Sequence, residues 1–144
     1  MSDTHDFRAS IGFQAAQIAR VSERRFEQKL TPLGLTRVLW SVLLAAGQEG
    51  LEQPSQIALF AGIDRTATSR ALRRLEATGM VTRQGMEDDK RHRKVVLTDK
   101  GREQLAIANR AADENAKYFA SKLSWYEANI LGDILQKLTK PENG

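Results

Sequence analysis

The chain has 144 residues, of which 41% are apolar and 28% charged, enough for one folded domain with a hydrophobic core. No stretch approaches the ~20 consecutive apolar residues of a transmembrane helix, and the first residues do not resemble a secretory signal, so we expect a cytoplasmic protein without membrane contact. Cysteine is absent, and the two histidines, His5 and His92, are far apart in the sequence. These counts exclude disulfides and thiol-based redox sensing, and neither a metal site nor a cofactor is predicted.

The net charge of +4 is unevenly distributed along the chain. Residues 65–102 contain eleven Lys/Arg and five Asp/Glu, a net charge of +6, whereas the rest contains 11 and 13, a net charge of −2. Such a local concentration of positive charge is typical of a surface that contacts the phosphate backbone of a nucleic acid.

Three helices are predicted before this basic region. Apolar residues at spacings of three and four predict the first over residues 6–30, with a stripe formed by Ile11, Ala15, Ile18, Phe26 and Leu30. Pro32 and Gly34 end it, and the same spacing predicts a second helix over residues 35–46. A third, short helix begins near Pro54 and ends at Gly62.

The fourth predicted helix is basic and amphipathic. Asp64 is a suitable N-cap, and Gly79 suits the left-handed turn that ends a helix. Thr68, Leu72 and Leu75 share the face that we expect to be buried. The opposite face carries Arg65, Thr66, Ser69, Arg70 and Arg73. Two helices joined by a tight turn at Gly62 and Ile63 are typical of a helix-turn-helix unit.

Two short β-branched runs follow, over residues 80–83 and 94–97, with about ten charge-rich residues between them. They predict a small β-hairpin with a polar tip, which after a helix-turn-helix is a wing. Thr98 then caps a long helix that runs to Leu123. Ser124 and Glu127 form a capping-box pattern for a last helix before Pro141.

The predicted fold class is mainly α with a small β-hairpin wing, a winged helix-turn-helix within a single domain spanning residues 1–144. Residues 35–101 form the DNA-binding region. The terminal helices, at residues 6–30 and 102–140, have more apolar surface than the central unit can cover, and we therefore expect them to build a homodimer. A symmetric pair would place two recognition helices about one DNA turn (~34 Å) apart on a palindromic operator.

The order of residues within this region resembles the multiple antibiotic resistance regulator (MarR) family of bacterial transcription factors. The resemblance rests on Asp89-Lys90-Arg91, Leu97-Thr98 and Gly101, preceded by Leu75-Glu76-Ala77-Thr78-Gly79-Met80-Val81-Thr82-Arg83. It implies that the fourth helix enters the major groove, that the wing arginine reaches the minor groove and that the terminal helices dimerise. It also implies a small anionic or aromatic ligand that weakens operator binding.

Residues on the fourth helix and the wing are the candidates for DNA contact. Arg70 suits either a bidentate bond to guanine or a phosphate, and these alternatives stay open. Arg91 suits a narrow A·T minor groove, with Asp89 bracing it, while Lys90, His92 and Lys94 are equally consistent with a solvated loop. Glu87 and Asp88 have no assigned role. The full predicted DNA-binding set is Arg65, Thr66, Ala67, Ser69, Arg70, Arg73, Arg74, Asp89, Arg91, Arg37 and Ser55.

An effector site is predicted between the first and second helices, lined by Phe13, Gln17, Arg20 and Trp40. Arg20 or Arg37 would supply a cation for an acidic or aromatic ligand. The alternative for Trp40 is a core position, which is the more common fate of a tryptophan in a small helical protein.

These features predict a sequence-specific, homodimeric transcriptional repressor that binds double-stranded DNA and is released by a small molecule. The alternative is a winged-helix module that binds proteins, which would expose apolar residues on the fourth helix where this chain has arginines. An enzyme is not expected, because no nucleophile elbow, phosphate-binding loop or metal-binding motif is present.

Overall fold

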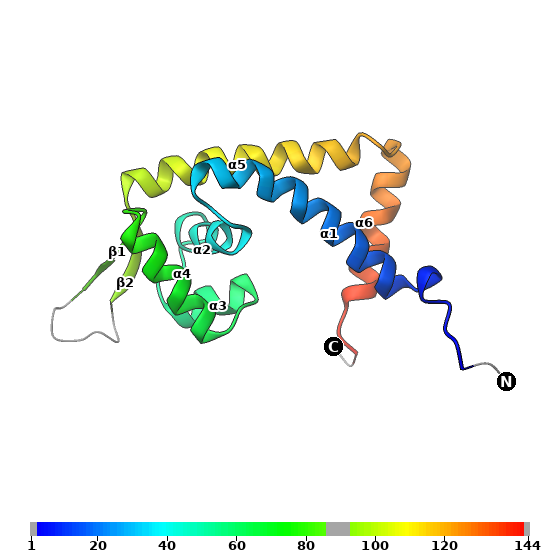
Figure 1. The fold of residues 1–144 in the computed structure, drawn as a ribbon, viewed down its shortest axis with the longest axis horizontal. Coiled ribbons are helices and arrows are strands. Elements are labelled where there is room, and N and C mark those ends of the chain that lie inside the picture. Colours follow the sequence, from blue (N-terminus) through cyan, green and yellow to red (C-terminus); the bar gives the residue numbers. More distant parts are fainter. Residues whose placement is uncertain (1–2, 86–92, 143–144) are drawn as a thin grey trace.

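The computed structural model describes residues 3–85 and 93–142. Helix α5 (Asp99–Ala120) forms a bar across the molecule, and α1 (Ile11–Leu30) packs against it with its second half while its start slants away toward α6 (Figure 1). The helix-turn-helix and the hairpin lie under one end of this bar, while α6 (Trp125–Thr139) and the N-terminus lie at the other. The fold is mainly α with a two-stranded antiparallel hairpin, as the sequence predicts.

Helix α1 begins later than its apolar stripe predicts. Residues Phe7–Ala9 form a separate 3-10 turn, and Ser10 adopts an extended conformation. The Ser10 hydroxyl accepts a hydrogen bond from the Phe13 amide at 3.3 Å, so it acts as the N-cap. Only Phe26 and Leu30, near the end of α1, are buried, whereas Ile11 and Ile18 are exposed.

The helix-turn-helix consists of α3 (Pro54–Ala61) and α4 (Arg65–Ala77), and α2 (Arg37–Gly47) packs against both. Thr36 caps α2 by accepting from the Leu39 amide, so α2 begins two residues later than predicted. Gly62 lies in the left-handed region, with φ 68°, and provides the turn between α3 and α4. Asp64 caps α4 through the Ala67 amide at 2.7 Å, as predicted.

The hairpin pairs β1 (Val81–Gln84) with β2 (Lys94–Leu97), from Val81 opposite Leu97 to Gln84 opposite Lys94. It follows Gly79, whose φ of 76° confirms the predicted left-handed turn. Val81, Val95 and Leu97 are buried against the helices. The hairpin is therefore anchored by its apolar inner face.

One hydrophobic core joins the helix-turn-helix, the hairpin and the first half of α5. Its fully buried members include Leu30, Leu43, Ile57, Leu72 and Leu75. Each side chain of this size contributes about 1.5–3 kcal/mol on burial. Since these residues come from four different helices, the core fixes how α4 is seated.

Helix α5 ends at Ala120, three residues earlier than predicted, in a turn in which the Leu123 amide bonds the Ala120 carbonyl. Helix α6 starts with the predicted capping box. The Ser124 amide donates to Glu127 Oε1, and the Ser124 hydroxyl accepts from the Glu127 amide. Hydrogen bonding by the Ser124 backbone, and then by its side chain, holds the pKa of the Glu127 carboxyl below its ordinary value. None of the residues of α6 is buried.

No single helix in the described part of the chain is long and apolar enough to cross a membrane. Two consecutive segments, Ile11–Leu33 and Arg37–Gly47, together have the length and composition of a membrane span, but they meet at a bend of 75°.

A test of the core concerns Gly101, where an added Cβ would collide with the Met80 backbone carbonyl. We expect Gly101→Ala to lower the free energy of unfolding by about 2–3 kcal/mol, because neither backbone segment can move away. Gly12→Ala is the matched control, since a Cβ there meets nothing within 4 Å. It should leave stability unchanged or raise it by up to ~1 kcal/mol. Equal thermal melting curves for the two variants would contradict this packing.

Candidate nucleic-acid interface

Helix α4 is amphipathic in the way that the sequence predicts. Thr68, Ala71, Leu72 and Leu75 are buried against the core. The buried Thr68 hydroxyl is satisfied, since it donates to the Asp64 carbonyl at 2.8 Å. The opposite face is exposed and carries Arg65, Thr66, Ser69, Arg70, Arg73 and Arg74, while Ala67 is half-buried at its edge.

The arginines on this face are largely free of acidic partners. Within residues 3–85 and 93–142, no ion pair involves Arg65, Arg70, Arg73 or Arg74. Each guanidinium carries five N–H donors in a planar fork. This face of α4 therefore presents unpaired cations to solvent.

The hairpin lies beside this face of α4. Arg83 on β1 is joined to Glu76 on α4, with Nε and Oε1 3.0 Å apart. Lys94 on β2 pairs with Glu52 at 3.4 Å, which gives it a structural partner. The predicted wing residues Asp89 and Arg91 lie outside the described residues, as do Glu87, Asp88, Lys90 and His92.

The two residues predicted at helix starts differ in availability. The Arg37 amide donates to Glu27 Oε1 at 2.7 Å, and its Nε lies 3.7 Å from Glu23. This amide already has a partner, because the Glu27 carboxylate of α1 caps α2, and the DNA contact of Arg37 stays a prediction. Ser55 is exposed in the first turn of α3.

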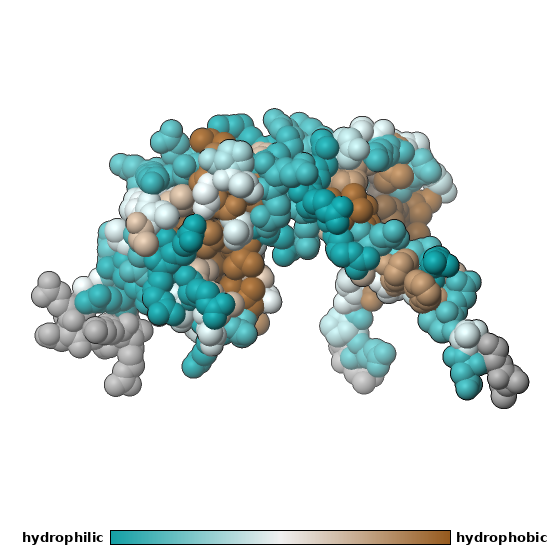
Figure 2. All heavy atoms as spheres, viewed as in Figure 1, coloured by the Kyte–Doolittle hydropathy of each residue, from teal (hydrophilic) through white to brown (hydrophobic). Residues whose placement is uncertain are grey.

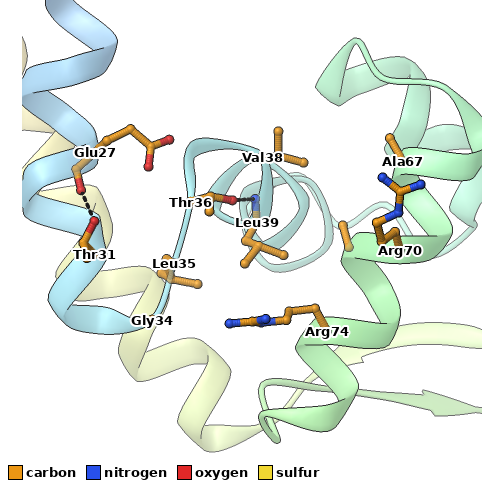
Figure 3. A pocket seen from close by; sticks show the side chains of 11 residues that line it. Glu27, Thr31, Gly34, Leu35, Thr36, Val38, Leu39, Ala67, Arg70 and Arg74 are labelled. Carbon is orange, nitrogen blue, oxygen red and sulfur yellow. Dashed lines mark hydrogen bonds between the residues drawn. The ribbon is translucent and has the colours of Figure 1, made fainter.

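A pocket of ≈ 610 Å³ opens between the end of α1, the start of α2 and α4. Its apolar wall includes Leu35, Val38 and Leu39. Arg74 reaches into it from α4, and Glu27 approaches from the opposite side (Figure 3). The remaining lining residues are Thr31, Gly34, Thr36, Ala67, Arg70 and Ala71. A cavity of this size suits a small molecule with an apolar body and an anionic group.

None of the four predicted effector residues lines this pocket. Trp40 is half-buried, with its ring edge-on to Phe26 at 4.9 Å and its indole N–H donating to Asn109 Oδ1 at 2.9 Å. Phe13 packs against Phe7 instead, thirteen residues and about 20 Å along α1 from Phe26. Phe13 is therefore far from Trp40 along α1, and the ligand role of Phe13, Gln17, Arg20 and Trp40 stays a prediction. The pocket was not predicted because its lining comes from three separate segments that the sequence does not place together.

The described part of the chain contains no group of three His, Cys, Asp or Glu side chains that could hold a metal ion.

A short turn between two helices, an exposed second helix and an adjacent hairpin define a winged helix-turn-helix protein. A sequence model of the MarR family matches residues 35–92. The structure of a probable transcriptional regulator from Pseudomonas aeruginosa is similar, with 27% sequence identity, a TM-score of 0.78, and coverage of 91% of this chain and 98% of that one. Residues 35–92 therefore match the MarR family, and the whole fold is similar to that of a probable transcriptional regulator.

Two further solved structures share the fold and contain ligands. A MarR family protein of Mycobacterium tuberculosis in complex with salicylic acid is 24% identical, with a TM-score of 0.72 and coverage of 96% of this chain and 99% of that one. CouR from Rhodococcus jostii RHA1, bound to p-coumaroyl-CoA, is 22% identical, with a TM-score of 0.79 and coverage of 98% and 99%.

The position of Trp40 yields a test of its role. Trp40→Phe keeps the aromatic contact with Phe26 but leaves Asn109 Oδ1 without its donor, so we expect a loss of about 1–2 kcal/mol in unfolding free energy. Asn109→Leu combined with Trp40→Phe should recover part of this loss. Binding of aromatic carboxylates, measured by calorimetry, should change less than twofold in Trp40→Phe. A tenfold loss of ligand binding at unchanged stability would instead make Trp40 a ligand contact.

Proposed function

We propose that this protein is a homodimeric, sequence-specific DNA-binding transcriptional repressor that a small anionic aromatic ligand releases from its operator, and that it acts in the cytoplasm. The observation that carries the proposal is the outward face of α4, which holds unpaired arginines at the recognition position of a winged helix-turn-helix.

The arrangement of α4 supports a division between reading bases and holding phosphates. Thr66, Ser69 and Arg70 lie in the first two turns, from which side chains of a recognition helix reach base edges. Arg73 and Arg74 follow and are assigned to phosphates, which fix the register of the helix on the duplex. Arg65, Ala67 and Ser55 border this surface, and Asp89 and Arg91 are assigned to the wing tip.

The terminal helices support the homodimer. Helix α6 has no buried residue, and an isolated 15-residue helix is only marginally stable in water. Apolar side chains are exposed along the part of the molecule that contains α6 and the start of α1 (Figure 2). They are Ile11, Ile18, Val21, Trp125, Tyr126, Ile130, Leu131, Ile134, Leu135 and Leu138. We assign residues 6–30 and 102–140 to dimerisation and 35–101 to DNA binding, since a second copy would cover these faces.

The pocket beside α4 supports ligand control. Two structural relatives hold salicylic acid and p-coumaroyl-CoA, both of which combine an aromatic ring with an acidic group. Leu35, Val38 and Leu39 suit the ring, and Arg74 suits the acid. Because Arg70 and Arg74 belong to both the pocket and the DNA-facing helix, a bound anion would compete with DNA for the same guanidiniums.

The DNA-binding proposal is tested by the salt dependence of operator affinity, with the operator recovered from a random DNA pool. If each protomer neutralises about four phosphates, log K should fall against log salt with a slope near −7 for the dimer. A slope shallower than about −2 would contradict DNA binding.

Arg91→Ala should weaken binding and remove A·T preference together, while Arg74→Ala should weaken binding to all sequences alike. Unchanged affinity in Arg91→Ala would remove the wing assignment.

The ligand proposal is tested by two neighbouring arginines. Arg74 lines the pocket beside α2, whereas Arg73 does not. We expect Arg74→Gln to weaken salicylate binding about tenfold, because a charge-assisted hydrogen bond is lost, and Arg73→Gln to leave it unchanged. Both variants should weaken operator binding, which makes Arg73→Gln the matched control. If calorimetry shows no salicylate binding and salicylate leaves operator affinity unchanged, this ligand class is wrong.

A further inference from the structure

A second hollow, of ≈ 410 Å³, lies between α4 and the hairpin, on the other side of α4 from the pocket already described. It is lined by Ser69, Arg73 and Glu76 of α4, Arg83 of β1, and Arg93, which directly precedes β2. Three guanidiniums therefore surround a single carboxylate. We refer to these five residues as the arginine cleft.

The hairpin register brings Arg83 to this position. Arg83 pairs with Val95, so the two side chains share a face of the hairpin. Val81 and Val95 are buried on that face, but Arg83 lies toward the tip, where the apolar core ends. Its side chain lies against α4, and Glu76 accepts a hydrogen bond from its Nε at 3.0 Å.

Two of the arginines are tethered in the same manner. Arg83 is bound through Nε to Glu76, and Arg73 is bound through Nε to the Ser69 carbonyl at 3.4 Å. A guanidinium held at Nε keeps its two terminal amino groups, with four N–H donors, free to form a planar fork. No hydrogen bond or ion pair occupies these terminal groups elsewhere in residues 3–85 and 93–142.

The charge balance indicates an anionic occupant. Glu76 offsets one of the three guanidiniums, which leaves two positive charges beside a small hollow. Arg93 forms no ion pair with any residue that the structure describes. A singly charged phosphodiester offers oxygens that match guanidinium forks and would relieve the repulsion among the arginines.

We propose that the arginine cleft binds one backbone phosphate of each operator half-site, clamped between the recognition helix and the base of the wing. Arg73, Arg83 and Arg93 contact the phosphate, and Glu76 is a positioning residue that orients Arg83. The inference rests on the proposed DNA-binding function and deepens it, because Arg83, Arg93 and Glu76 are absent from the set predicted from sequence.

The test combines an Arg93→Gln variant of the full-length protein with operator fragments in which one phosphate per half-site is replaced by a neutral methylphosphonate. At one position, the replacement should weaken wild-type binding on the order of tenfold per half-site, and the penalty should be clearly smaller in Arg93→Gln, in which only Arg73 and Arg83 contact the phosphate. Arg93→Gln should also make the salt slope shallower by about 0.9 per protomer. Arg110→Gln, an exposed position on α5 outside the cleft, is the matched control and should keep the full methylphosphonate penalty.

Two results would overturn the assignment while leaving DNA binding intact. One is that Arg93→Gln and Arg110→Gln respond alike to every methylphosphonate. The other is that Arg93→Gln abolishes calorimetric binding of inorganic phosphate yet shows no coupling to any DNA phosphate, in which case the cleft takes a free anion. If the wild-type protein does not bind the selected DNA at all, the proposed function fails and the cleft assignment fails with it.

The role of Glu76 is tested by two substitutions. Glu76→Gln keeps an oxygen that accepts from Arg83 Nε, so operator affinity should be retained or rise. Glu76→Ala removes the acceptor, and affinity should fall about threefold or more because Arg83 loses its orientation. If both variants raise affinity equally, Glu76 acts only through its charge and is not a positioning residue. Circular dichroism confirms that each variant is folded.

Discussion

The seating of α4 on the core is the constraint on which the rest of the structure depends. Leu72 and Leu75 are completely buried, and Thr68 is buried with its hydroxyl satisfied by the preceding turn. These positions recur at spacings of three and four, so they define one stripe of the helix. A rotation of one residue, about 100°, would turn arginines toward the core, where an unpaired charge is strongly unfavourable. Burial of three side chains therefore fixes the direction of every cation on the opposite face.

Helix α4 lines two pockets of different chemistry. One is mainly apolar and is reached by Arg74, while the other is cationic and contains Arg73. Adjacent residues on a helix are separated by about 100°, so neighbouring arginines naturally point to opposite sides of α4. A ligand on one side and a phosphate on the other would thus act on one rigid element. Binding of the ligand and binding of the phosphate would be coupled directly, because both would act on the position and charge of α4.

Local features of the fold were predictable from the sequence, and long-range contacts were not. Asp64 and Ser124 cap their helices as predicted because a cap depends on residues two or three positions away. Ser10 was passed over as a cap because the apolar stripe continues through it, and the helix starts five residues later than predicted. Trp40 was assigned to a ligand site, yet its position is decided by Phe26 and by Asn109, which is 69 residues away.

The ion pairs of the candidate site were also not predictable from the sequence. The sequence indicates a cluster of eleven basic residues, but it does not show which of them are already paired. Arg83 is held by Glu76 across the junction of helix and strand, and the Arg37 amide is held by a carboxylate of the preceding helix. The Arg83–Glu76 pair depends on the register of the hairpin, and the Arg37–Glu27 bond depends on how the chain turns between α1 and α2. The arginine face of α4 was predictable from helical spacing, whereas the partners of Arg83 and of the Arg37 amide were not.

The exposed helix α6 links this surface to assembly. With no buried residue and with Trp125 81% exposed, α6 gains little stability from its own chain. In the proposed homodimer its folding would be coupled to association, and so would the position of α5, which carries the winged unit. On the proposed function, a single winged unit would bind one half-site, and its separation from a second unit would be set only when α6 has a partner. Cooperative recognition of two half-sites would then depend on the apolar faces of α6, at the opposite end of the molecule from α4, and dilution below the dimerisation constant would lower operator affinity without changing any contact residue.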